Sequence, residues 1–437
     1  MYFDRAAIDV PREGDANVRP ALAPGLVDMR NAVLMAVEWH PTIRNAVASL
    51  QESSEYIDAA RAGYYPQVRG GVNSQFGNRN ADRYGGRQVH RATLSATQML
   101  YDFGKVSSGV DKAMAQQLAA RARVLLAMDQ LVQDTAHAVI EVQRYQRLDE
   151  LAQEQITGVS AIANLARQRR ALGASTLSDE TQAEAREDAA RATSLQMKAQ
   201  LQRWRSALSH LLGQAQAMHV TDQVPSALGQ SCSVAEPDWL LVPAVMVAEA
   251  DRAAARAELD QRGAQTLPTL SLEGSVSRGL NAQSSVDGSR NDATVMVNLS
   301  MPLYQGGMLQ ATRRAAAHAL GAADSAVTHA RLSASQGLMD ARAQAVGLQQ
   351  RNQVLGNRTQ SILRTRDLYR QQYLDLGTRT LLDLLNAEQE YHQARFDHAH
   401  NQHDLYRLQV ACLYGAGRLR DAFALADGTI AGLELRP

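Results

Sequence analysis

The sequence lacks several features that enzymes and nucleic-acid-binding proteins carry. Its 45 Lys and Arg are balanced by 45 Asp and Glu, so it has no basic excess, and we expect no nucleic-acid partner. Aromatic residues make up only 5% of the 437 residues, which favours long alanine-rich helices over a compact enzyme core. Phosphate loops, dinucleotide fingerprints and nucleophile elbows are missing. We therefore expect no enzyme, no catalytic residue, no cofactor and no resident metal.

Cysteine is scarce, and long apolar runs do not occur. Cys232 and Cys412 are far apart and match no metal or redox spacing, so we interpret both as bystanders. No run of 18 apolar residues is present, so the sequence predicts no transmembrane helix. Residues 1–26 lack the basic and apolar regions of a signal peptide and any cysteine for a lipid anchor, and we expect them to be extended.

The chain does contain a tandem repeat with a period of about 200 residues. The landmarks that recur at this spacing are Pro66 and Pro268, Gly104 and Gly307, Gly173 and Gly377, and Gly213 and Gly415. The repeat predicts two units, residues 27–213 and 239–415, with a linker at 214–238 and a C-terminal tail at 416–437. Each unit has the pattern of a helix, a β-hairpin (67–98 or 269–301), a very long helix and a return helix.

The hairpin segments alternate between apolar and polar residues with a period of two. The apolar positions are Val68, Val72, Phe76, Ala92, Leu94, Ala96, Leu270, Leu272, Val276, Val295, Val297 and Leu299. Each strand is about 10 residues long, which is the length of a transmembrane β-strand with one face toward lipid. An ordinary half-exposed sheet alternates in the same way, and alternation alone favours that simpler interpretation.

Aromatic residues at one end of the strands favour the membrane interpretation. They are Tyr64, Tyr65, Tyr101, Phe103 and Tyr304, and they would form an interfacial girdle. The loops at the other end, residues 77–87 and 279–292, are polar and rich in glycine. Four strands cannot close a barrel, and lipid does not tolerate open sheet edges, so several chains would have to share one barrel. Two chains would give eight strands, and three would give twelve, which leaves room for a lumen.

The segments from Gly104 to Gly173 and from Gly307 to Gly377 predict two helices of about 100 Å each. They contain no proline and are rich in Ala, Leu and Arg. A helix of this length needs neighbours, as in a coiled coil. The stretch "MPLYQGG", with Pro302, Gly306 and Gly307, turns a strand into the second long helix, and Gly104 does the same in the first unit. A soluble coiled-coil scaffold is the alternative, although it would have no use for the two hairpins.

The sequences "GASTLSDE" and "GTRTLLDL" mark the tips, where each long helix turns into its return helix. Thr176 and Asp179, like Thr380 and Asp383, have the spacing of a capping box, and capping alone is one complete explanation of both carboxylates. The alternative is that Asp179 and Asp383 face a central axis, where rings of carboxylates would prefer cations. Arg379 would then bind a neighbouring turn and hold the tip shut.

Histidines cluster in "YHQARFDHAHNQHDLY", with His392, His398, His400 and His403. His400 and His403 could share a helix face as metal ligands. No carboxylate–histidine motif of a metalloenzyme accompanies them, so a solvated helix face is the preferred interpretation.

Almost the whole chain, about residues 27–415, resembles the TolC-like outer-membrane efflux proteins. The resemblance rests on "MPLYQGG", on the weaker "LYDFGK" and above all on "LDLGTRTLLDLLNAEQEYHQAR". It implies a mainly α fold with a small β part. In this fold a homotrimer shares one twelve-stranded transmembrane barrel, and long antiparallel helical hairpins form an α-barrel tunnel that is closed by their tips.

The resemblance also implies a location, partners and gating residues. The location is the outer membrane of a Gram-negative bacterium, with the tunnel in the periplasm. The partners are a periplasmic adaptor, an inner-membrane ABC exporter or other pump, and outer-membrane lipid. At the second tip Gly377, Thr378, Arg379, Thr380 and Asp383 match the family pattern, and at the first Asp179 does, with Ser178 replacing a usual Thr.

The expected pore constriction therefore comprises Asp179, Ser178, Arg379, Thr380 and Asp383. Asn386 stands where the family has a second acidic residue, and Leu374 where a tyrosine often precedes the tip. A single Asp383 ring would attract cations less, which suits a protein cargo. The most favoured function is an exit duct for type I protein secretion, to which the tip motif and the missing lipid-anchor cysteine also point. The alternative is the outer-membrane component of a drug or metal efflux pump.

Overall fold

The structure is a computed structural model, and it describes residues 26–77, 87–214, 218–233, 237–280, 291–425, 429–430 and 433–434. The N-terminal segment 1–25, most of the two polar strand loops and much of the tail lie outside the described residues. The chain divides into two compact units. One unit contains Ala46–Val124 and Pro243–Leu332, and the other contains the chain up to Asn45, Leu125–Val242 and the chain from Ser333 onward.

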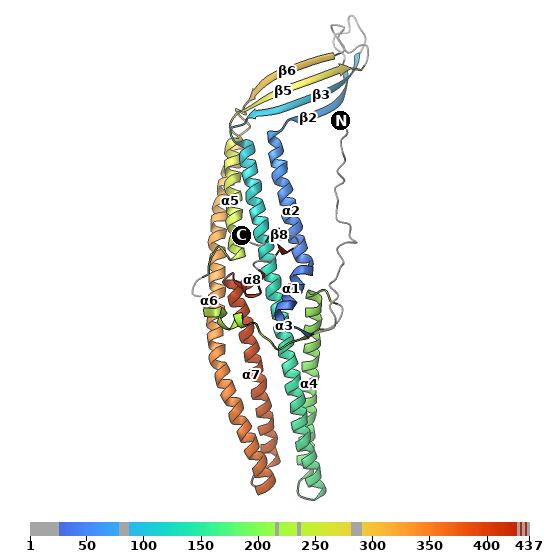
Figure 1. Cartoon of the computed structure of the whole chain (residues 1–437), viewed down its shortest axis with the longest axis vertical. Coiled ribbons are helices and arrows are strands. Elements are labelled where there is room, and N and C mark those ends of the chain that lie inside the picture. Colours follow the sequence, from blue (N-terminus) through green and yellow to red (C-terminus); the bar gives the residue numbers. More distant parts are fainter. Residues whose placement is uncertain are drawn as a thin grey trace. The chain divides into compact units, whose positions relative to one another are not determined.

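The unit formed by Ala46–Val124 and Pro243–Leu332 carries a four-stranded antiparallel sheet (Figure 1) and is called the sheet-bearing unit. Its strands are β2 (Gln67–Gly77), β3 (Arg87–Tyr101), β5 (Thr269–Gly279) and β6 (Asn291–Ser300), in the order β2-β3-β5-β6. β2 with β3 and β5 with β6 form the two hairpins, and β3 pairs with β5 between them. The hairpins from the two halves of the chain therefore make one sheet, with β2 and β6 at its open edges.

The strand register places the apolar residues of all four strands on one face. Leu94 lies opposite Gly70 on one side and Val276 on the other, and Val276 lies opposite Ala293. The apolar face carries Val68, Val72, Ala92, Leu94, Ala96, Leu270, Leu272, Val276, Val295, Val297 and Leu299. Val68 is 65% exposed and Val295 is 79% exposed, so nothing in the described chain covers this face. The predicted alternation is confirmed, and it produces an exposed apolar surface rather than the buried face of an ordinary sheet.

The opposite face is polar and hydrogen-bonded across the strands. Ser275 and Thr294 hydroxyl oxygens lie 2.8 Å apart, and the Asn298 amide donates to Glu273 Oε1 at 3.0 Å. Cross-strand pairs of this kind stabilise one register over its neighbours. Because the side-chain period is two, a slip by one residue would exchange the two faces.

The five aromatic residues all lie at the helix-proximal end of the strands. Tyr65 and Tyr304 are 67% and 86% exposed, and the rings of Tyr101 and Phe103 meet edge to face at 4.6 Å. Two strand-to-helix turns occur at the same end. Phe103 and Gly104 in the first turn, and Gly306 and Gly307 in the second, all have positive φ, and Pro302 lies in the segment between β6 and the second turn. Glycine adopts this left-handed backbone without steric cost.

The sheet-bearing unit contains α5 (Pro243–Ala264) and, from Ala46 onward, α2 (Pro41–Arg61), together with the first parts of α3 (Lys105–Ala171) and α6 (Met308–Gln371). The Asp102 carboxylate starts α3 by accepting hydrogen bonds from the backbone N–H groups of Gly104 and Val106, at 3.0 and 2.6 Å. The single helix expected at the start of the first repeat is two helices. Pro41 separates α1 (Met29–Trp39) from α2, because the residue before a proline is driven to an extended backbone.

The other unit contains the rest of α3 and α6 with their return helices, α4 (Leu177–Leu211) and α7 (Leu381–Gly415). It also contains α1, the short helices η3 (Ser226–Ser233) and α8 (Leu419–Ala422), and the paired strands β1 (Leu26–Val27) and β4 (His219–Val220). The core between α3 and α7 is formed by Leu148, Leu151, Ala152, Phe396 and Ala399. Among the described residues, none of the helices combines the length and the apolar composition of a membrane-spanning helix.

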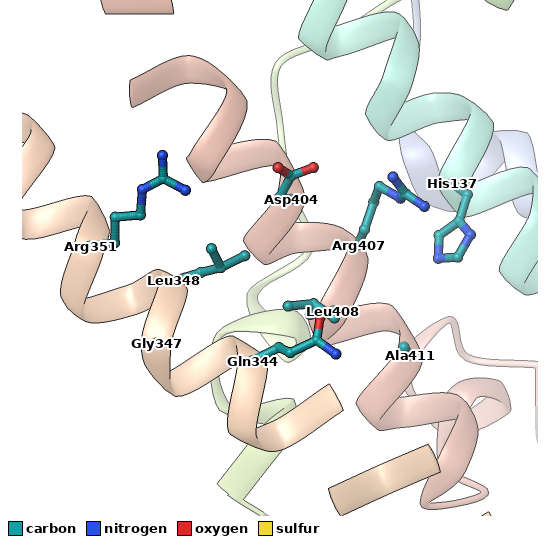
Figure 2. Close-up of a pocket in the computed structure, with 9 residues that line it drawn as sticks. All are labelled: His137, Gln344, Gly347, Leu348, Arg351, Asp404, Arg407, Leu408 and Ala411. Carbon is teal, nitrogen blue, oxygen red and sulfur yellow. The ribbon is translucent and has the colours of Figure 1, made fainter. Parts of the chain in front are cut away.

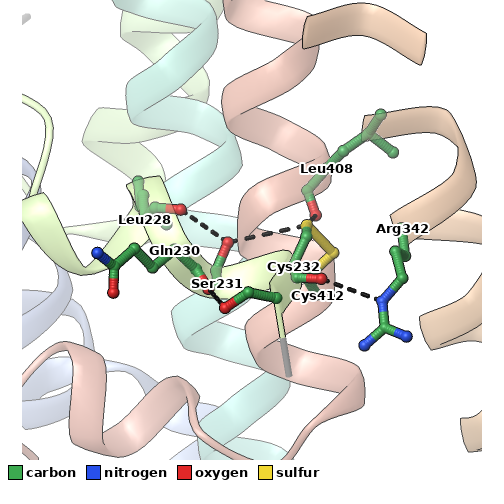
Figure 3. The surroundings of a disulfide bond; sticks show 8 residues. Leu228, Gln230, Ser231, Cys232, Arg342, Leu408 and Cys412 are labelled. Carbon is green, nitrogen blue, oxygen red and sulfur yellow. Dashed lines mark hydrogen bonds between the residues drawn. A yellow bond between two sulfur atoms is a disulfide. The ribbon is translucent and has the colours of Figure 1, made fainter. Parts of the chain in front are cut away.

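The interpretation of the two cysteines as bystanders is wrong. Cys232 in η3 and Cys412 in α7 form a disulfide across 180 residues of sequence (Figure 3). The Arg342 side chain of α6 donates its Nε–H to the Cys232 carbonyl at 3.0 Å, so linker, α6 and α7 meet at one point. Disulfides persist in oxidising compartments such as the bacterial periplasm. Only the fold brings these residues together, and their spacing in the sequence gives no sign of it.

The expectation of a solvated histidine face is also wrong for two of its members. His392 is 2% exposed and His403 is 8% exposed. His392 Nε2 lies 3.1 Å from Glu388 Oε1, and His403 Nδ1 lies 2.7 Å from the Ala399 carbonyl oxygen. They are buried because α7 packs on both α3 and α6, so more than one of its faces is covered. Among the described residues, no group of three or more His, Cys, Asp or Glu is arranged to hold a metal.

Candidate functional site at the helix tips

Each long helix ends at a left-handed glycine that reverses the chain. Gly173 follows α3 with φ 71°, and its N–H donates to the Arg170 carbonyl while that of Ala174 donates to Arg169. These bonds close the α3 C-terminus in the manner of a Schellman motif. Gly377 follows α6 with φ 63°, after a π-helical turn at Gln372–Leu376 that the sequence did not indicate.

At the first tip, Thr176 and Asp179 form a complete capping box at the start of α4. The Asp179 backbone N–H donates to Thr176 Oγ1 at 3.1 Å, and the Thr176 N–H donates to Asp179 Oδ2 at 3.1 Å. The Ser175 hydroxyl also donates to Asp179 Oδ2, at 2.9 Å. The Thr176 N–H, and after it the Ser175 hydroxyl, lower the pKa of Asp179. Ser178 is exposed beside it.

At the second tip, Thr380 and Asp383 repeat this arrangement at the start of α7. Asp383 Oδ2 accepts hydrogen bonds from the Thr380 N–H at 3.1 Å and from its hydroxyl at 2.9 Å. The Thr380 N–H, then its hydroxyl, and more weakly the Arg379 charge lower the pKa of Asp383. The capping predicted from the spacing is confirmed at both tips, and both carboxylates are charged at neutral pH.

Arg379 is held by the end of its own long helix. Its Nε–H donates to Gln372 Oε1 at 3.1 Å, and its guanidinium lies 4.3 Å from the centre of the Tyr369 ring. Arginine stacks on aromatic rings through the charge and the flat shape of the guanidinium. The side chain therefore braces the turn between α6 and α7.

The two tips also pack against each other. Tyr373, on the π-helical turn after α6, is 5% exposed and lies under the guanidinium of Arg169 on α3, at 4.4 Å from the ring centre. Around it is an apolar cluster of Ile162, Ala163, Ala166, Ala183, Leu381, Leu384 and Leu385. Nothing in the sequence indicated Tyr373, because the family pattern has its tyrosine at the position of Leu374, one residue later.

Polar side chains link the two return helices near the tips. Arg186 on α4 donates to Asn386 Oδ1 on α7 at 3.3 Å and also to the Gln389 side chain. Arg170 of α3 pairs with Glu180 of α4 within the first tip. Asn386, which stands where the family has an acidic residue, thus offers a neutral hydrogen-bond acceptor to the Arg186 guanidinium. Such contacts are reversible, so the tips can be separated without breaking covalent bonds.

A cavity of about 550 Å³ lies farther from the tips, between α3, α6 and α7 (Figure 2). Figure 2 shows Arg407 beside His137 and Asp404 one turn away on α7. Asp404 pairs with Arg144 at 2.5 Å. Burial, and next the positive charge of Arg407, lower the pKa of His137 to about 4, so this imidazole is neutral at physiological pH. Most of the cavity wall is apolar, and its charged members are Arg351, Asp404 and Arg407.

Comparison with known proteins identifies the family. The model of the family described as outer membrane efflux protein matches residues 33–214 and 241–413. The outer membrane efflux protein BepC of Brucella suis is 24% identical over 402 residues, covering 90% of this chain and 85% of that protein. The outer membrane protein TolC of Vibrio cholerae is 25% identical over 392 residues, covering 86% and 87%.

Solved structures share the fold. The outer membrane protein VceC of Vibrio cholerae superposes with a TM-score of 0.76 at 19% identity, covering 89% of this chain and 96% of that one. CusC superposes with a TM-score of 0.78 at 20% identity, covering 91% and 92%. These likenesses concern the fold alone.

Proteins of this family are channels, not enzymes. They are trimeric, lie in the outer membrane of Gram-negative bacteria with a tunnel in the periplasm, and act with periplasmic adaptors and inner-membrane pumps. A soluble coiled-coil scaffold is thereby excluded. The chain belongs to the outer membrane efflux protein family, and it is an outer-membrane channel protein of the TolC type.

Proposed function

We propose that three copies of this chain form the exit duct of a tripartite export system and that its cargo is a protein secreted by the type I route. The observation that carries the duct is the exposed apolar face of the sheet, bounded by the unpaired edges β2 and β6. Lipid tolerates no open edge, so β6 of one copy pairs with β2 of the next until twelve strands close the barrel.

Within this proposal, the two repeats, 27–213 and 239–415, contribute equivalent parts to one wall. Each supplies a hairpin to the barrel and a pair of long helices to the tunnel. Gly104, Gly306 and Gly307 turn the chain from barrel to tunnel, since their positive φ permits the sharp change of direction. The exposed aromatic residues, such as Tyr65 and Tyr304, lie at the periplasmic border of the membrane.

The helix tips form the gate. Asp179 and Asp383 contribute rings of carboxylates at the narrowest part of the tunnel, and Ser178 and Thr380 lie beside them. Their hydrogen-bonded caps keep both carboxylates charged and fixed in place. Arg379 braces the second tip through Gln372 and Tyr369. An adaptor and an inner-membrane ABC exporter would engage the tips and separate them.

Protein cargo is supported by Asn386, which stands where the family has a second acidic residue at this tip. Asn386 is neutral and accepts a hydrogen bond from Arg186, so Asp383 is not reinforced by a second carboxylate on α7. A less negative constriction holds multivalent cations less firmly and obstructs an unfolded polypeptide less. The name of the Brucella relative, an outer membrane efflux protein, favours the second candidate, the outer component of a drug or metal pump.

Deletion of the gene in its native host separates these two candidates. Loss of a protein from the culture medium, with drug and metal tolerance unchanged, is the expected result. An unchanged set of secreted proteins together with increased sensitivity to drugs or metals would replace protein secretion by efflux.

A further inference from the structure

Among the described side chains on the apolar face of the sheet, Arg278 is the one cation. Arg278 of β5 lies opposite Ala92 of β3 and Asn291 of β6, on the face that also carries Leu272 and Val276. Its side chain is exposed. Within the residues that the structure describes, its guanidinium has neither a hydrogen bond nor an ion pair. A charge on a mainly apolar face that turns toward lipid needs a specific partner.

Arg278 is at the loop end of this face, far along the strands from the aromatic residues. Ser74 and His90 occupy the same end of the same face, with Ser74 Oγ 2.8 Å from His90 Nδ1. One step inward the facing residues are Leu94, Val276 and Ala293. The apolar band therefore has an aromatic border at the helix end and a polar, cationic border at the loop end.

The spacing of these borders is that of a membrane. From Leu270, opposite Tyr101, to Arg278 is eight residues, or about 26 Å along the strand. With the usual tilt of about 40°, this is about 20 Å across the membrane, near the ~25 Å band of such barrels. Arg278 is thus at the outer border of the hydrocarbon, where its long side chain reaches the headgroups.

We propose that Arg278 binds the phosphate of a phosphorylated lipid headgroup in the outer leaflet, at one site per chain. The planar guanidinium offers two parallel N–H groups to phosphate oxygens, and a charge-assisted pair is strong at the edge of a low-dielectric medium. The side chain faces lipid and not the lumen, so a dissolved anion reaches it poorly. The inference rests on the proposed barrel, which orients this face toward lipid.

The chain provides a matched control in Arg91. Arg91 precedes Ala92, the partner of Arg278, so it lies at the same height on the opposite, polar face, and it is also exposed. Arg91→Gln removes the same charge from the same sheet, but from the side that faces water. Arg278→Lys keeps the charge and removes the two-pronged geometry.

The experiment measures lipid binding to the purified full-length channel in detergent by native mass spectrometry. The probes are lipid A carrying its two phosphates and the same lipid with the phosphates removed. We expect wild type and Arg91→Gln to prefer the phosphorylated lipid. We expect Arg278→Gln to bind it about tenfold more weakly, with Arg278→Lys in between. Competition by inorganic phosphate should need far higher concentrations than competition by the lipid.

Several outcomes would overturn the proposal. These are equal binding of the two lipids, equal weakening by Arg91→Gln and Arg278→Gln, or displacement by inorganic phosphate at concentrations matching the lipid, which would assign the site to a free anion. Planar-bilayer conductance of each variant separates this site from the barrel itself. Conductance retained in all variants leaves the barrel in place, whereas a wild type without conductance contradicts the proposed function.

Discussion

The guanidinium of Arg169 covers the ring of Tyr373 at 4.4 Å, and this contact joins the end of one helical hairpin to the end of the other. Tyr373 is also the aromatic centre of the apolar cluster between the tips. In the gate proposed above, opening separates the hairpins, so this pair would oppose opening directly. A cation over an aromatic ring contributes about 0.5–2 kcal/mol, an amount that a docking partner can readily overcome.

Replacing Tyr373 with Ala should open the tips. The substitution removes both the stacking partner of Arg169 and a large buried side chain, which typically costs about 3–5 kcal/mol. We expect a several-fold rise in single-channel conductance of the purified protein. Tyr373→Phe keeps the ring and should conduct like wild type. Equal conductance of the Ala variant and wild type would show that other contacts keep the tips closed.

The two roles of the second capping box can be separated by paired variants. Asp383→Asn keeps an oxygen that accepts the Thr380 N–H but loses the charge, so cation selectivity, measured by reversal potentials, should fall with little loss of stability. Thr380→Ala removes the cap and should cost about 0.5–2 kcal/mol of folding stability, with selectivity retained.

The same carboxylate predicts how selectivity depends on pH. Since the pKa of Asp383 is lowered, wild-type selectivity should persist below the pH at which an ordinary aspartate is protonated. Unchanged selectivity in Asp383→Asn would leave Asp383 with the cap alone.

Much of the fold was predictable because its signals are local. The alternation of Val295, Val297 and Leu299 depends only on the two-residue period of a strand, and the register observed for β6 preserves it. The capping boxes span four residues each, so their spacing predicted them. The long helices were predictable because the segments from Gly104 to Gly173 and from Gly307 to Gly377 contain no proline, and so no residue in them breaks the hydrogen-bond ladder.

What escaped prediction depends on contacts between distant segments. Cys232 and Cys412 are 180 residues apart, and only the packing of η3 on α7 makes them neighbours. His392 is polar in sequence, but the packing of α7 buries it, with Glu388 one turn earlier on the same helix as its partner. Tyr373 lies on a π-helical turn, whose extra residue changes the direction of side chains relative to a regular helix. Local patterns carry no information about these arrangements.

Removing the disulfide should destabilise the helical unit that contains it. The bond closes a loop of about 180 residues, and the loss of such a crosslink typically costs about 2–5 kcal/mol. The double variant with Cys232→Ser and Cys412→Ser should melt at a lower temperature than oxidised wild type and match wild type treated with reductant. Identical melting of oxidised and reduced wild type would contradict a stabilising role.

The buried Asp129 should make stability depend on pH. It is fully buried on α3, with Oδ1 3.6 Å from Arg420 Nε, and burial raises its pKa to about 7 despite that cation. The native state therefore binds a proton that the unfolded state releases, and stability falls as pH rises from about 4 to 7. The shift corresponds to at most about 4 kcal/mol.

Thermal unfolding between pH 5 and pH 8 measures this effect, with Asp129→Asn as the control. The variant keeps the shape without the charge, so its melting temperature should change less over this range than that of wild type. The same loss of stability in wild type and Asp129→Asn would assign the pH dependence to other groups.

Conductance of the purified full-length chain in planar bilayers tests the central claim most directly, because it requires a closed barrel, a continuous tunnel and tips that open. The account predicts a detergent-extracted trimer that inserts from one side and conducts in discrete steps, with larger steps for Tyr373→Ala. A chain that stays monomeric in water without detergent and produces no steps at any voltage would contradict it.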